Sequence, residues 1–448
     1  MKLDLPNSSS MRSPEFLFGV ATSSFQIEGS ADSRLESIWD RFCDTPGKIL
    51  DGSDGTTACD HLERLEEDVN LMADMGIDAY RLSISWPRVM HRDGTLNANG
   101  MDFYKRLLDS LNQNGIKPFV TLYHWDLPQF LEDKGGWLNR DTAYHFRDYA
   151  ECVSRELADR VFSYATLNEP YCSARLSYEL GVHAPGFKNR GMAKRAAHHL
   201  LLAHGLAMPV LRENCPGAMC GIVVNLSPCH PASDSEANRQ AAEWADQDFN
   251  HWYLQPVLSG GYPALFDHLP MGERPDVRHG DFEKICQPLD FLGVNYYSRS
   301  LVKAGKECLF EDVPPVDVPL TDMGWEIYPE GLDEVLQMLR TKYVVPPIFI
   351  TENGIALKEE VTSEGIDDLD RIRYFASHLE VLDRAMESGV NVRGYFAWSL
   401  MDNFEWNYGY SKRFGLVHID YHSQKRTLKT SGRAYREMLK TRNIGEQG

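Results

Sequence analysis

Residues 347–353 of the chain read PIFITEN, a run of apolar and β-branched residues that ends in a carboxylate and an amide. Residues 162–168 read FSYATLN and are followed by Glu169, so the same arrangement occurs twice. A carboxylate at the end of an apolar strand is costly to bury unless it has a task. Both segments therefore predict strands whose carboxyl ends carry functional groups.

Six further apolar runs occur along the chain, separated by longer stretches with helical spacing. In total the eight runs cover residues 16–22, 79–85, 117–123, 162–168, 220–226, 290–297, 347–353 and 392–400. They are nearly continuous in apolar residues, as parallel strands covered on both faces should be. This alternation predicts an α/β fold, a single (β/α)8 TIM barrel with its active site at the C-terminal ends of the strands. The alternative, an open doubly wound sheet, would normally carry a Gly-rich phosphate turn, which this chain lacks.

The stretches between the runs predict amphipathic helices over residues 62–75, 103–114, 142–159 and 193–213. Gly76 and Gly115 follow two of them and are expected to end those helices. Residues 1–14 are polar and Ser-rich, so we expect a flexible N-terminal tail. Residues 15–448 are expected to form one catalytic barrel domain.

The composition narrows the classes of function. The 448 residues carry a net charge of −19, which argues against nucleic acid or an anionic membrane as a partner. There is no apolar run of the roughly 18 residues that a membrane span needs. The nine cysteines are odd in number and form no CxxC pair, so we interpret them as reduced thiols. The first residues lack the pattern of a secretory signal, and a cytoplasmic enzyme is the expectation.

Glu169 and Glu352 close the fourth and seventh runs, so a closed barrel would direct both at one central pocket. Two facing carboxylates can cleave a glycosidic bond, with retention of configuration at a separation of about 5–5.5 Å and inversion at about 6.5–9.5 Å. A structural ion pair at a strand end is the alternative. Other runs also end near polar or aromatic side chains of chemical use, among them Gln26, Arg81, His124, Asn225, Asn295, Tyr297 and Trp398.

Seven motifs give the chain a resemblance to glycoside hydrolase family one, the β-glucosidase family. They are FGVATSSFQIEG (18–29), YRLSISWPR (80–88), LYHWDLP (122–128), LNEP (167–170), GVNYY (293–297), ITENG (350–354) and WSLMDNFEW (398–406). The resemblance extends from about Phe16 to Leu439. It implies that Glu169 is the general acid/base and that Glu352 is the nucleophile. It also implies that Arg81, Asn295 and Tyr297 support catalysis.

The same resemblance implies a set of sugar-binding residues. A hexose presents a ring of hydroxyl groups and an apolar C–H face, so its site needs polar partners and an aromatic platform. Trp398 is expected to stack on the sugar and Asn168 to face its 2-hydroxyl. The remaining members of this set are Gln26, His124, Trp125, Glu405 and Trp406. For any one of them taken alone, a buried core residue is the simpler interpretation.

Glu405 bears on the choice of sugar, because a carboxylate near the 6-position would repel a 6-phosphate. The phospho-sugar members of the family carry a smaller hydroxyl residue at the position of Glu405. Because this chain has the carboxylate instead, Lys412 is interpreted as an ordinary loop lysine. Departures from the family pattern lie on the leaving-group side. Many relatives carry Trp where this chain has Tyr171, and many carry an apolar residue where it has Arg175. Trp325 is expected to line the aglycone channel.

The sequence thus predicts a retaining β-glycosidase that releases terminal β-D-glucosyl residues from cello-oligosaccharides or from aryl and alkyl β-glucosides. A preference for galactosides or fucosides, and transglycosylation, remain open as alternatives. A non-catalytic sugar-binding relative and a 6-phospho-β-glucosidase are more remote, because both glutamates and Glu405 are present. Only a small glycoside is expected as a partner. Neither metal nor cofactor is expected. We expect a monomer or a homo-oligomer, and a role in cellulose degradation.

Overall fold

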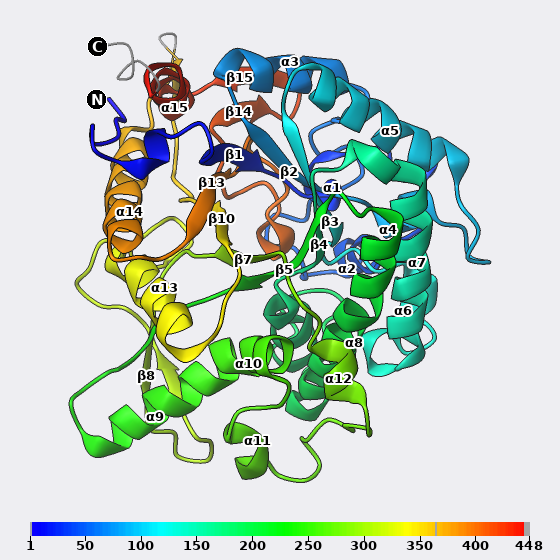
Figure 1. The fold of residues 1–448 in the computed structure, drawn as a ribbon, viewed down its shortest axis with the longest axis vertical. Helices are drawn as coiled ribbons and strands as arrows, with labels where there is room; N and C mark the ends of the chain where they lie inside the picture. Colours follow the sequence, from blue (N-terminus) through cyan, green and yellow to red (C-terminus); the bar gives the residue numbers. More distant parts are fainter. Residues whose placement is uncertain (1, 363–364, 443–448) are drawn as a thin grey trace.

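A computed structural model describes residues 2–362 and 365–442 and has a closed barrel of eight parallel strands at its centre (Figure 1). The strands follow one another around the barrel in the order β1-β2-β3-β4-β5-β7-β10-β13, and β13 pairs with β1. Their bounds are β1 Leu17–Ala21, β2 Ala79–Ser83, β3 Lys117–Tyr123, β4 Ser163–Asn168, β5 Met219–Asn225, β7 Phe291–Asn295, β10 Ile348–Asn353 and β13 Val392–Trp398. Each of the eight predicted runs contains one of these strands to within a residue, so the TIM barrel is confirmed.

Helices surround the barrel, as the ribbon in Figure 1 shows. The longer ones are α3 Leu65–Met75, α5 Ala98–Gln113, α7 Asp141–Leu157, α8 Arg190–Asn214, α9 Glu236–Asp246, α10 Trp252–Ser259, α13 Glu330–Lys342, α14 Leu369–Glu387 and α15 Thr430–Thr441. Shorter helices are α1 Ser24–Ile27, α2 Ile38–Cys43, α4 Trp86–Val89, α6 Gln129–Glu132, α11 Leu265–His268 and α12 Asp281–Ile285. Across residues 2–362 and 365–442, no helix has both the length and the apolar character that crossing a membrane would require.

The four predicted helices correspond to α3, α5, α7 and α8. Gly76 and Gly115 adopt the left-handed backbone conformation at φ 72° and 73°, as helix-ending glycines do. Helix α5 begins five residues earlier than predicted. The side chain of Asn97 accepts a hydrogen bond from the Gly100 backbone N–H and caps the helix, a polar start that apolar spacing does not reveal.

Smaller sheets lie outside the barrel and were not predicted. Strands β6 Cys229–Pro231, β8 Ser300–Lys303 and β9 Glu311–Val313 form one sheet, and β14 Val417–Asp420 pairs with β15 Lys425–Leu428 in another. A two-residue pair, β11 Val361–Thr362 and β12 Gly365–Ile366, forms a third. The first of these sheets follows directly on two barrel strands, so it extends the wall around their carboxyl ends.

Phenylalanine side chains fill the barrel interior below the strand ends. Phe119 packs against Phe349 and Phe396 at ring-centroid distances of 5.3 and 4.9 Å, and Phe291 packs against Phe349 at 5.8 Å. A Cβ at Gly19 would lie 2.3 Å from the Phe396 ring, so only glycine lets this ring approach the neighbouring strand. The packed interior leaves space for a ligand only at the carboxyl ends of the strands.

Part of the N-terminal segment, for which a flexible tail was expected, packs against the barrel domain. Leu3, Leu5 and Met11 are buried in the main hydrophobic core, and residues 10–12 form a short 3₁₀ turn. The Ser9 hydroxyl donates to Asp383 on α14 at 2.6 Å. Leu3, Leu5 and Met11 stand among polar residues in the sequence, so the local composition does not reveal their burial.

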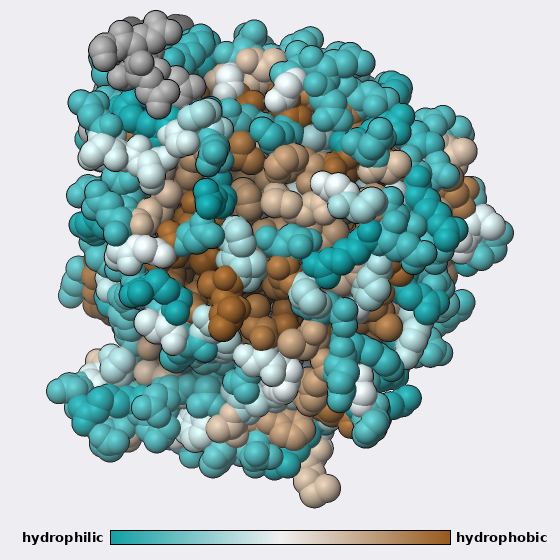
Figure 2. Space-filling model, in the orientation of Figure 1, coloured by the Kyte–Doolittle hydropathy of each residue, from teal (hydrophilic) through white to brown (hydrophobic). Residues whose placement is uncertain are grey.

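The outer surface is mostly hydrophilic, with teal side chains over the surrounding helices in Figure 2 and a hydrophobic area near the centre of this face. This distribution matches amphipathic helices packed on an apolar barrel. All nine cysteines lie within the described residues and are free thiols, as predicted, although Cys308 is exposed. Cys59, Cys172, Cys215 and Cys220 are buried.

Candidate active site

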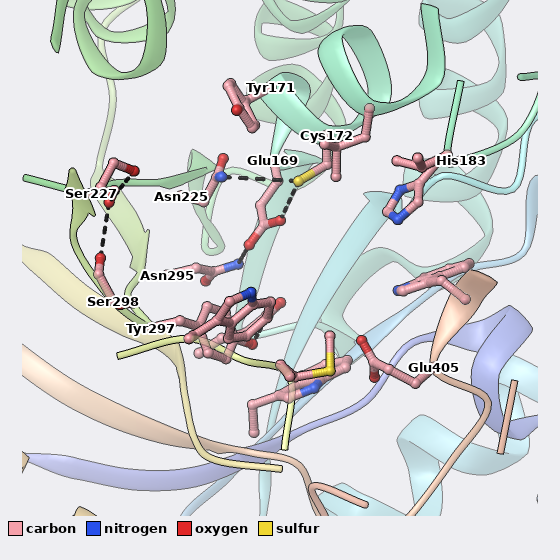
Figure 3. Close-up of a pocket in the computed structure, with 18 of the residues that line it drawn as sticks. Glu169, Tyr171, Cys172, His183, Asn225, Ser227, Asn295, Tyr297, Ser298 and Glu405 are labelled. Carbon is pink, nitrogen blue, oxygen red and sulfur yellow. Dashed lines mark hydrogen bonds between the residues drawn. The ribbon is translucent and has the colours of Figure 1, made fainter. Parts of the chain in front are cut away.

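A cavity of about 450 Å³ opens at the carboxyl ends of the barrel strands. Figure 3 shows side chains from several strands converging on it. Of the predicted site residues, those that line it are His124, Trp125, Glu169, Tyr171, Asn295, Tyr297, Trp325, Glu352, Trp398, Glu405 and Trp406. Arg81, Asn168 and Gln26 are buried next to these residues, and Arg175 lies outside the lining.

Glu352 closes β10 and is 4% exposed. The Arg81 guanidinium donates to its Oε1 at 2.5 Å, and the Tyr297 hydroxyl donates to its Oε2 at 2.7 Å. A cation and a hydroxyl donor both favour a negatively charged carboxylate. Glu352 is therefore arranged to carry a negative charge in a buried position.

Glu169 follows β4 and has different surroundings. The Asn295 side-chain N–H donates to its Oε1 at 2.6 Å, and the Cys172 thiol donates to its Oε2 at 3.0 Å. No cation contacts this carboxyl directly among the described residues. Burial and the nearby Glu352 together raise the pKa of Glu169 to about 7. The group can therefore hold a proton at neutral pH.

An amide network joins the surroundings of the two glutamates. Asn168 Oδ1 accepts from Arg81 Nη2 at 2.7 Å and from Asn295 Nδ2 at 3.0 Å. The Thr351 hydroxyl donates to Asn295 Oδ1 at 2.7 Å and fixes the orientation of that amide. Because each member has at least two partners, the network fixes the positions of both carboxyl groups relative to each other.

Aromatic rings form one wall of the cavity. Trp398 and Trp406 both stack on His124, with ring centroids 6.0 and 5.9 Å apart, and Trp125 lies 4.6 Å from Trp406. Burial, reinforced by Arg81, lowers the pKa of His124 well below its usual value, so this imidazole is neutral. His124 Nδ1 is buried and has no hydrogen-bond partner among the described residues.

Glu405 enters the cavity from the loop after β13 (Figure 3). Its Oε2 is buried and lacks a hydrogen-bond partner within the described chain. Burial, with Glu352 and Glu169 nearby, raises the pKa of Glu405 to about 8. An unpartnered buried acceptor is costly and is satisfied when a ligand hydroxyl group donates to it.

Gln26 does not line the cavity, although it was predicted to contact the sugar. Its amide N–H donates to Asn403 Oδ1 at 3.0 Å and to the Phe404 carbonyl at 2.7 Å, while the Ser23 hydroxyl donates to its Oε1 at 2.6 Å. Gln26 therefore braces the loop that carries Glu405.

Three residues around the site adopt positive φ without being glycine. They are Trp125 at 77°, Glu169 at 46° and Trp406 at 51°. Such conformations cost about 1–3 kcal/mol each and persist where the surroundings enforce them. Their concentration around one cavity agrees with a functional site.

Tyr171 and Trp325, two of the three residues expected on the leaving-group side, line the cavity, and Arg175 does not. Tyr171 packs against Phe249 at a centroid distance of 4.1 Å, and Trp325 packs against Tyr297 at 5.3 Å. The Arg175 guanidinium instead pairs with Asp248 at 3.3 Å and lies over the Tyr171 ring. Arg175 thus supports Tyr171 from behind.

Several residues that line the cavity were not predicted, because they belong to no motif. Cys172, His183, Phe249 and Met323 line the cavity. Cys172 begins the π-helical segment η5, Cys172–Glu179, that follows Glu169. The three-residue spacing from Glu169 was the available signal, since one helical turn returns a side chain to the same side.

A second acidic cluster lies outside the cavity. Ligand atoms of Glu359, Asp402 and His418 lie within 4.8 Å of one another. Lys429 contacts both carboxylates at 2.6 and 2.7 Å, and Arg371 and Arg413 each contact one of them. These cations balance the negative charge, so the cluster is a buried ion-pair network.

A TIM barrel with two carboxyl groups in one polar and aromatic cavity, one ion-paired and one with a raised pKa, has the organisation of a glycoside hydrolase. Comparison with known proteins agrees. The family model of glycosyl hydrolase family 1 matches residues 9–444, and the chain belongs to this family.

Curated relatives and solved structures cover almost the whole chain. Beta-glucosidase A of Acetivibrio thermocellus is 46% identical over 95% of this chain and 97% of its own length. A beta-glucosidase of Agrobacterium sp. is 45% identical over 96% of each chain. The structure of the Thermotoga maritima beta-glucosidase in complex with glucoimidazole is 43% identical, with a TM-score of 0.93, over 96% of this chain and 99% of that one.

Proposed function

We propose that this protein is a retaining β-glucosidase that releases terminal, non-reducing β-D-glucosyl residues from cello-oligosaccharides or from aryl and alkyl β-glucosides. The observation that carries the proposal is the contrast between two carboxyl groups of one cavity. Glu352 has cationic and hydroxyl donors, whereas burial raises the pKa of Glu169 to about 7. The relatives named beta-glucosidase support the same conclusion.

In the first step, a Glu352 oxygen attacks the anomeric carbon while Glu169 donates its proton to the glycosidic oxygen. The bond between the anomeric carbon and that oxygen breaks, the alcohol leaves, and a glycosyl ester forms on Glu352. Arg81 and Tyr297 hold Glu352 in position for the attack.

In the second step, the ester has removed the negative charge of Glu352. Since that charge contributes to the raised pKa of Glu169, its loss lowers this pKa and favours the carboxylate. Glu169 then takes a proton from water, the water oxygen attacks the anomeric carbon, and Glu352 leaves as a carboxylate. Two inversions give net retention.

The sugar is held by residues around the two glutamates. Trp398 offers its ring to the C–H face of the hexose, and the unpartnered Glu405 Oε2 accepts from a distal hydroxyl group. Asn168 serves the 2-hydroxyl. His124, Trp125 and Trp406 complete the set, and Gln26 acts through the loop that carries Glu405.

A 6-phosphate does not fit this arrangement. Lys412, which follows the last motif, donates to the Asp322 carbonyl at 2.5 Å and pairs with the Asp322 carboxylate at 3.1 Å. An unphosphorylated sugar is therefore proposed. A fucoside is a second substrate, since a relative from Bifidobacterium breve that is 46% identical is named a bifunctional beta-D-glucosidase/beta-D-fucosidase.

The reaction needs neither metal nor cofactor, because the two carboxyl groups supply the nucleophile and the acid/base. Cellulose degradation is the pathway class that fits cello-oligosaccharide substrates. A cytoplasmic location is proposed because all nine cysteines are free. Cell fractionation tests the location, and light scattering distinguishes a monomer from a homo-oligomer.

Hydrolysis of p-nitrophenyl β-D-glucoside by the wild type and by Glu352→Gly, with and without azide, tests the proposal. Loss of the carboxylate should reduce kcat by at least about 10⁴-fold, because no nucleophile remains. The small cavity left by the variant should admit azide, which attacks the activated glucoside 2,4-dinitrophenyl β-D-glucoside directly and gives α-glucosyl azide.

Full activity of Glu352→Gly would contradict the assignment of the nucleophile. A β-glucosyl azide product from this variant would contradict the retaining mechanism. A wild type that cleaves only the 6-phosphorylated glucoside would contradict the reading of Glu405.

A further inference from the structure

A short chain of side-chain contacts runs from Asn225 to the proposed acid/base, as the dashed lines in Figure 3 show. Asn225 Nδ2 donates to Cys172 Sγ at 3.9 Å, and the Cys172 thiol donates to Glu169 Oε2 at 3.0 Å. Asn225 closes β5, and Cys172 begins η5 one turn after Glu169. Two separate elements therefore hold the sulfur against the carboxyl group.

The orientation of the Asn295 amide is fixed by a neighbouring hydroxyl group. The Thr351 hydroxyl donates to Asn295 Oδ1, so Asn295 presents its N–H to Glu169 Oε1. Oε1 is thereby occupied by an obligate donor, and the transferable proton of Glu169 resides on Oε2. The sulfur accepts from Asn225, which leaves the thiol hydrogen free to point at this same Oε2.

We propose that Cys172 is a positioning residue for Glu169. Its thiol donates a hydrogen bond to Glu169 Oε2 whenever Glu169 is ionised, and so stabilises the base form that activates water. The inference rests on the proposed glycosidase function and extends it. When Glu169 is protonated, the sulfur lies beside the Oε2–H group and holds the carboxyl plane toward the cavity. The thiol takes no part in covalent chemistry.

The thiol remains a donor under working conditions. Burial raises the pKa of Cys172 well above its usual value, with Glu169 and Glu352 adding to the effect, so the sulfur keeps its hydrogen. Within the described chain, the titratable and charged groups that act on Glu169 come from several elements, namely Cys172, Arg81, Glu352, Tyr297 and Glu405. Of these, only Cys172 donates a hydrogen bond to Oε2.

The pH dependence of kcat/KM for p-nitrophenyl β-D-glucoside, measured for Cys172→Ala and Cys172→Ser, tests the proposal. The alkaline limb reports loss of the acid proton from Glu169 in the free enzyme. A donor to the ionised form lowers a pKa, so its removal in Cys172→Ala should move this limb upward by about 0.5 pH unit, the size expected for a weak thiol hydrogen bond. Cys172→Ser keeps a donor and should leave the limb at or below the wild-type position, and the acid limb should stay in place in both variants.

Cys220→Ala is the matched control, because Cys220 is also a buried cysteine, at the other end of β5. Its alkaline limb should coincide with that of the wild type. An unmoved limb in a folded, active Cys172→Ala variant would overturn the proposal, and so would an equal shift in Cys220→Ala. If Cys172→Ala does not fold, an upward shift in Cys172→Ser overturns it.

A wild type without activity on any β-glucoside would overturn the proposed function and this inference with it. If the wild type is active and its alkaline limb is unmoved in Cys172→Ala, the inference alone is overturned. The two failures are therefore distinguishable in one set of measurements.

Discussion

Two glutamate side chains line one cavity of this protein, and their neighbours give them different properties. Glu352 has Arg81 and Tyr297 as donors, while Glu169 has an amide and a thiol. Division of labour between two carboxyl groups follows from such differences in surroundings. At the residue scale, each donor should therefore have a measurable effect on the step that its glutamate performs.

Removal of the Tyr297 hydroxyl in Tyr297→Phe should lower kcat/KM for p-nitrophenyl β-D-glucoside about 10- to 100-fold, because a hydrogen bond to a charged group contributes about 1.5–3 kcal/mol. The ring and its packing on Trp325 remain in this variant. Steady-state kinetics at the pH optimum provides the measurement.

The neighbouring Tyr296 offers a matched control for this change. It is buried, and its hydroxyl donates to the Tyr328 carbonyl away from both glutamates. Tyr296→Phe should therefore affect thermal stability more than kcat/KM. Equal kinetic losses in the two variants would contradict the assignment of the Tyr297 hydroxyl to Glu352.

At the scale of single elements, strands and helix ends followed from the sequence better than the contacts between them. Continuous apolar runs predicted all eight barrel strands, because burial on both faces selects such residues. Gly76 and Gly115 indicated two helix ends, because left-handed backbone favours glycine. The π-helical path of η5, which brings Cys172 to Glu169, has no comparable sequence signal.

The end of α5 provides a test of backbone conformation without side-chain effects. Gly115 has φ 73°, and a Cβ there would meet no atom within 4 Å. Gly115→Ala should therefore destabilise the protein by about 1 kcal/mol through left-handed strain alone. The comparison of thermal melting curves with the wild type measures the effect.

Gly217→Ala serves as the control for this substitution. A Cβ at Gly217 also meets no atom within 4 Å, and Gly217 is not in the left-handed region. Its melting temperature should be unchanged or slightly higher, since alanine restricts the unfolded chain. A melting temperature of Gly115→Ala at or above that of Gly217→Ala would contradict the strain argument.

At the scale of the whole molecule, buried ion pairs join segments that are far apart in the sequence. Lys429, which precedes α15, contacts Glu359 and Asp402 and is fully buried. Although burial raises the pKa of Asp402, Lys429, His418 and Arg413 outweigh it and hold this pKa far below its usual range. A lowered carboxyl pKa stabilises the fold above the unfolded value of about 4, and this contribution is lost as the pH falls toward the folded value.

Lys429→Met should remove this contribution and leave two buried carboxylates without their shared cation. We expect a loss of about 3–5 kcal/mol at neutral pH. The melting temperature should also fall less steeply between pH 5 and 3 than in the wild type, as measured by thermal denaturation across that range. The exposed Lys425→Met should reproduce the wild-type curve, and an unchanged curve for Lys429→Met would refute the role of the network.

Much of the candidate site could be predicted because its residues lie in strand-end motifs. The structure brings Glu169, Glu352, Trp398 and Glu405 to one cavity. The position of Arg175 depends on Asp248, which is 73 residues away, and the bracing contacts of Gln26 depend on the loop near residue 404. Such partners come from tertiary packing, which no local pattern of residues encodes.

Closure of the barrel has a consequence for how the protein is made. Strand β1 pairs with β13, so the first barrel strand cannot complete its pairing until the last strand has been synthesised. During synthesis the ribosome releases residues 17–21 long before residues 392–398, and in that interval β1 exposes an unpaired edge to other chains. A nascent chain of this topology spends most of its translation with an open sheet, and this is the period in which a molecular chaperone has the most to protect.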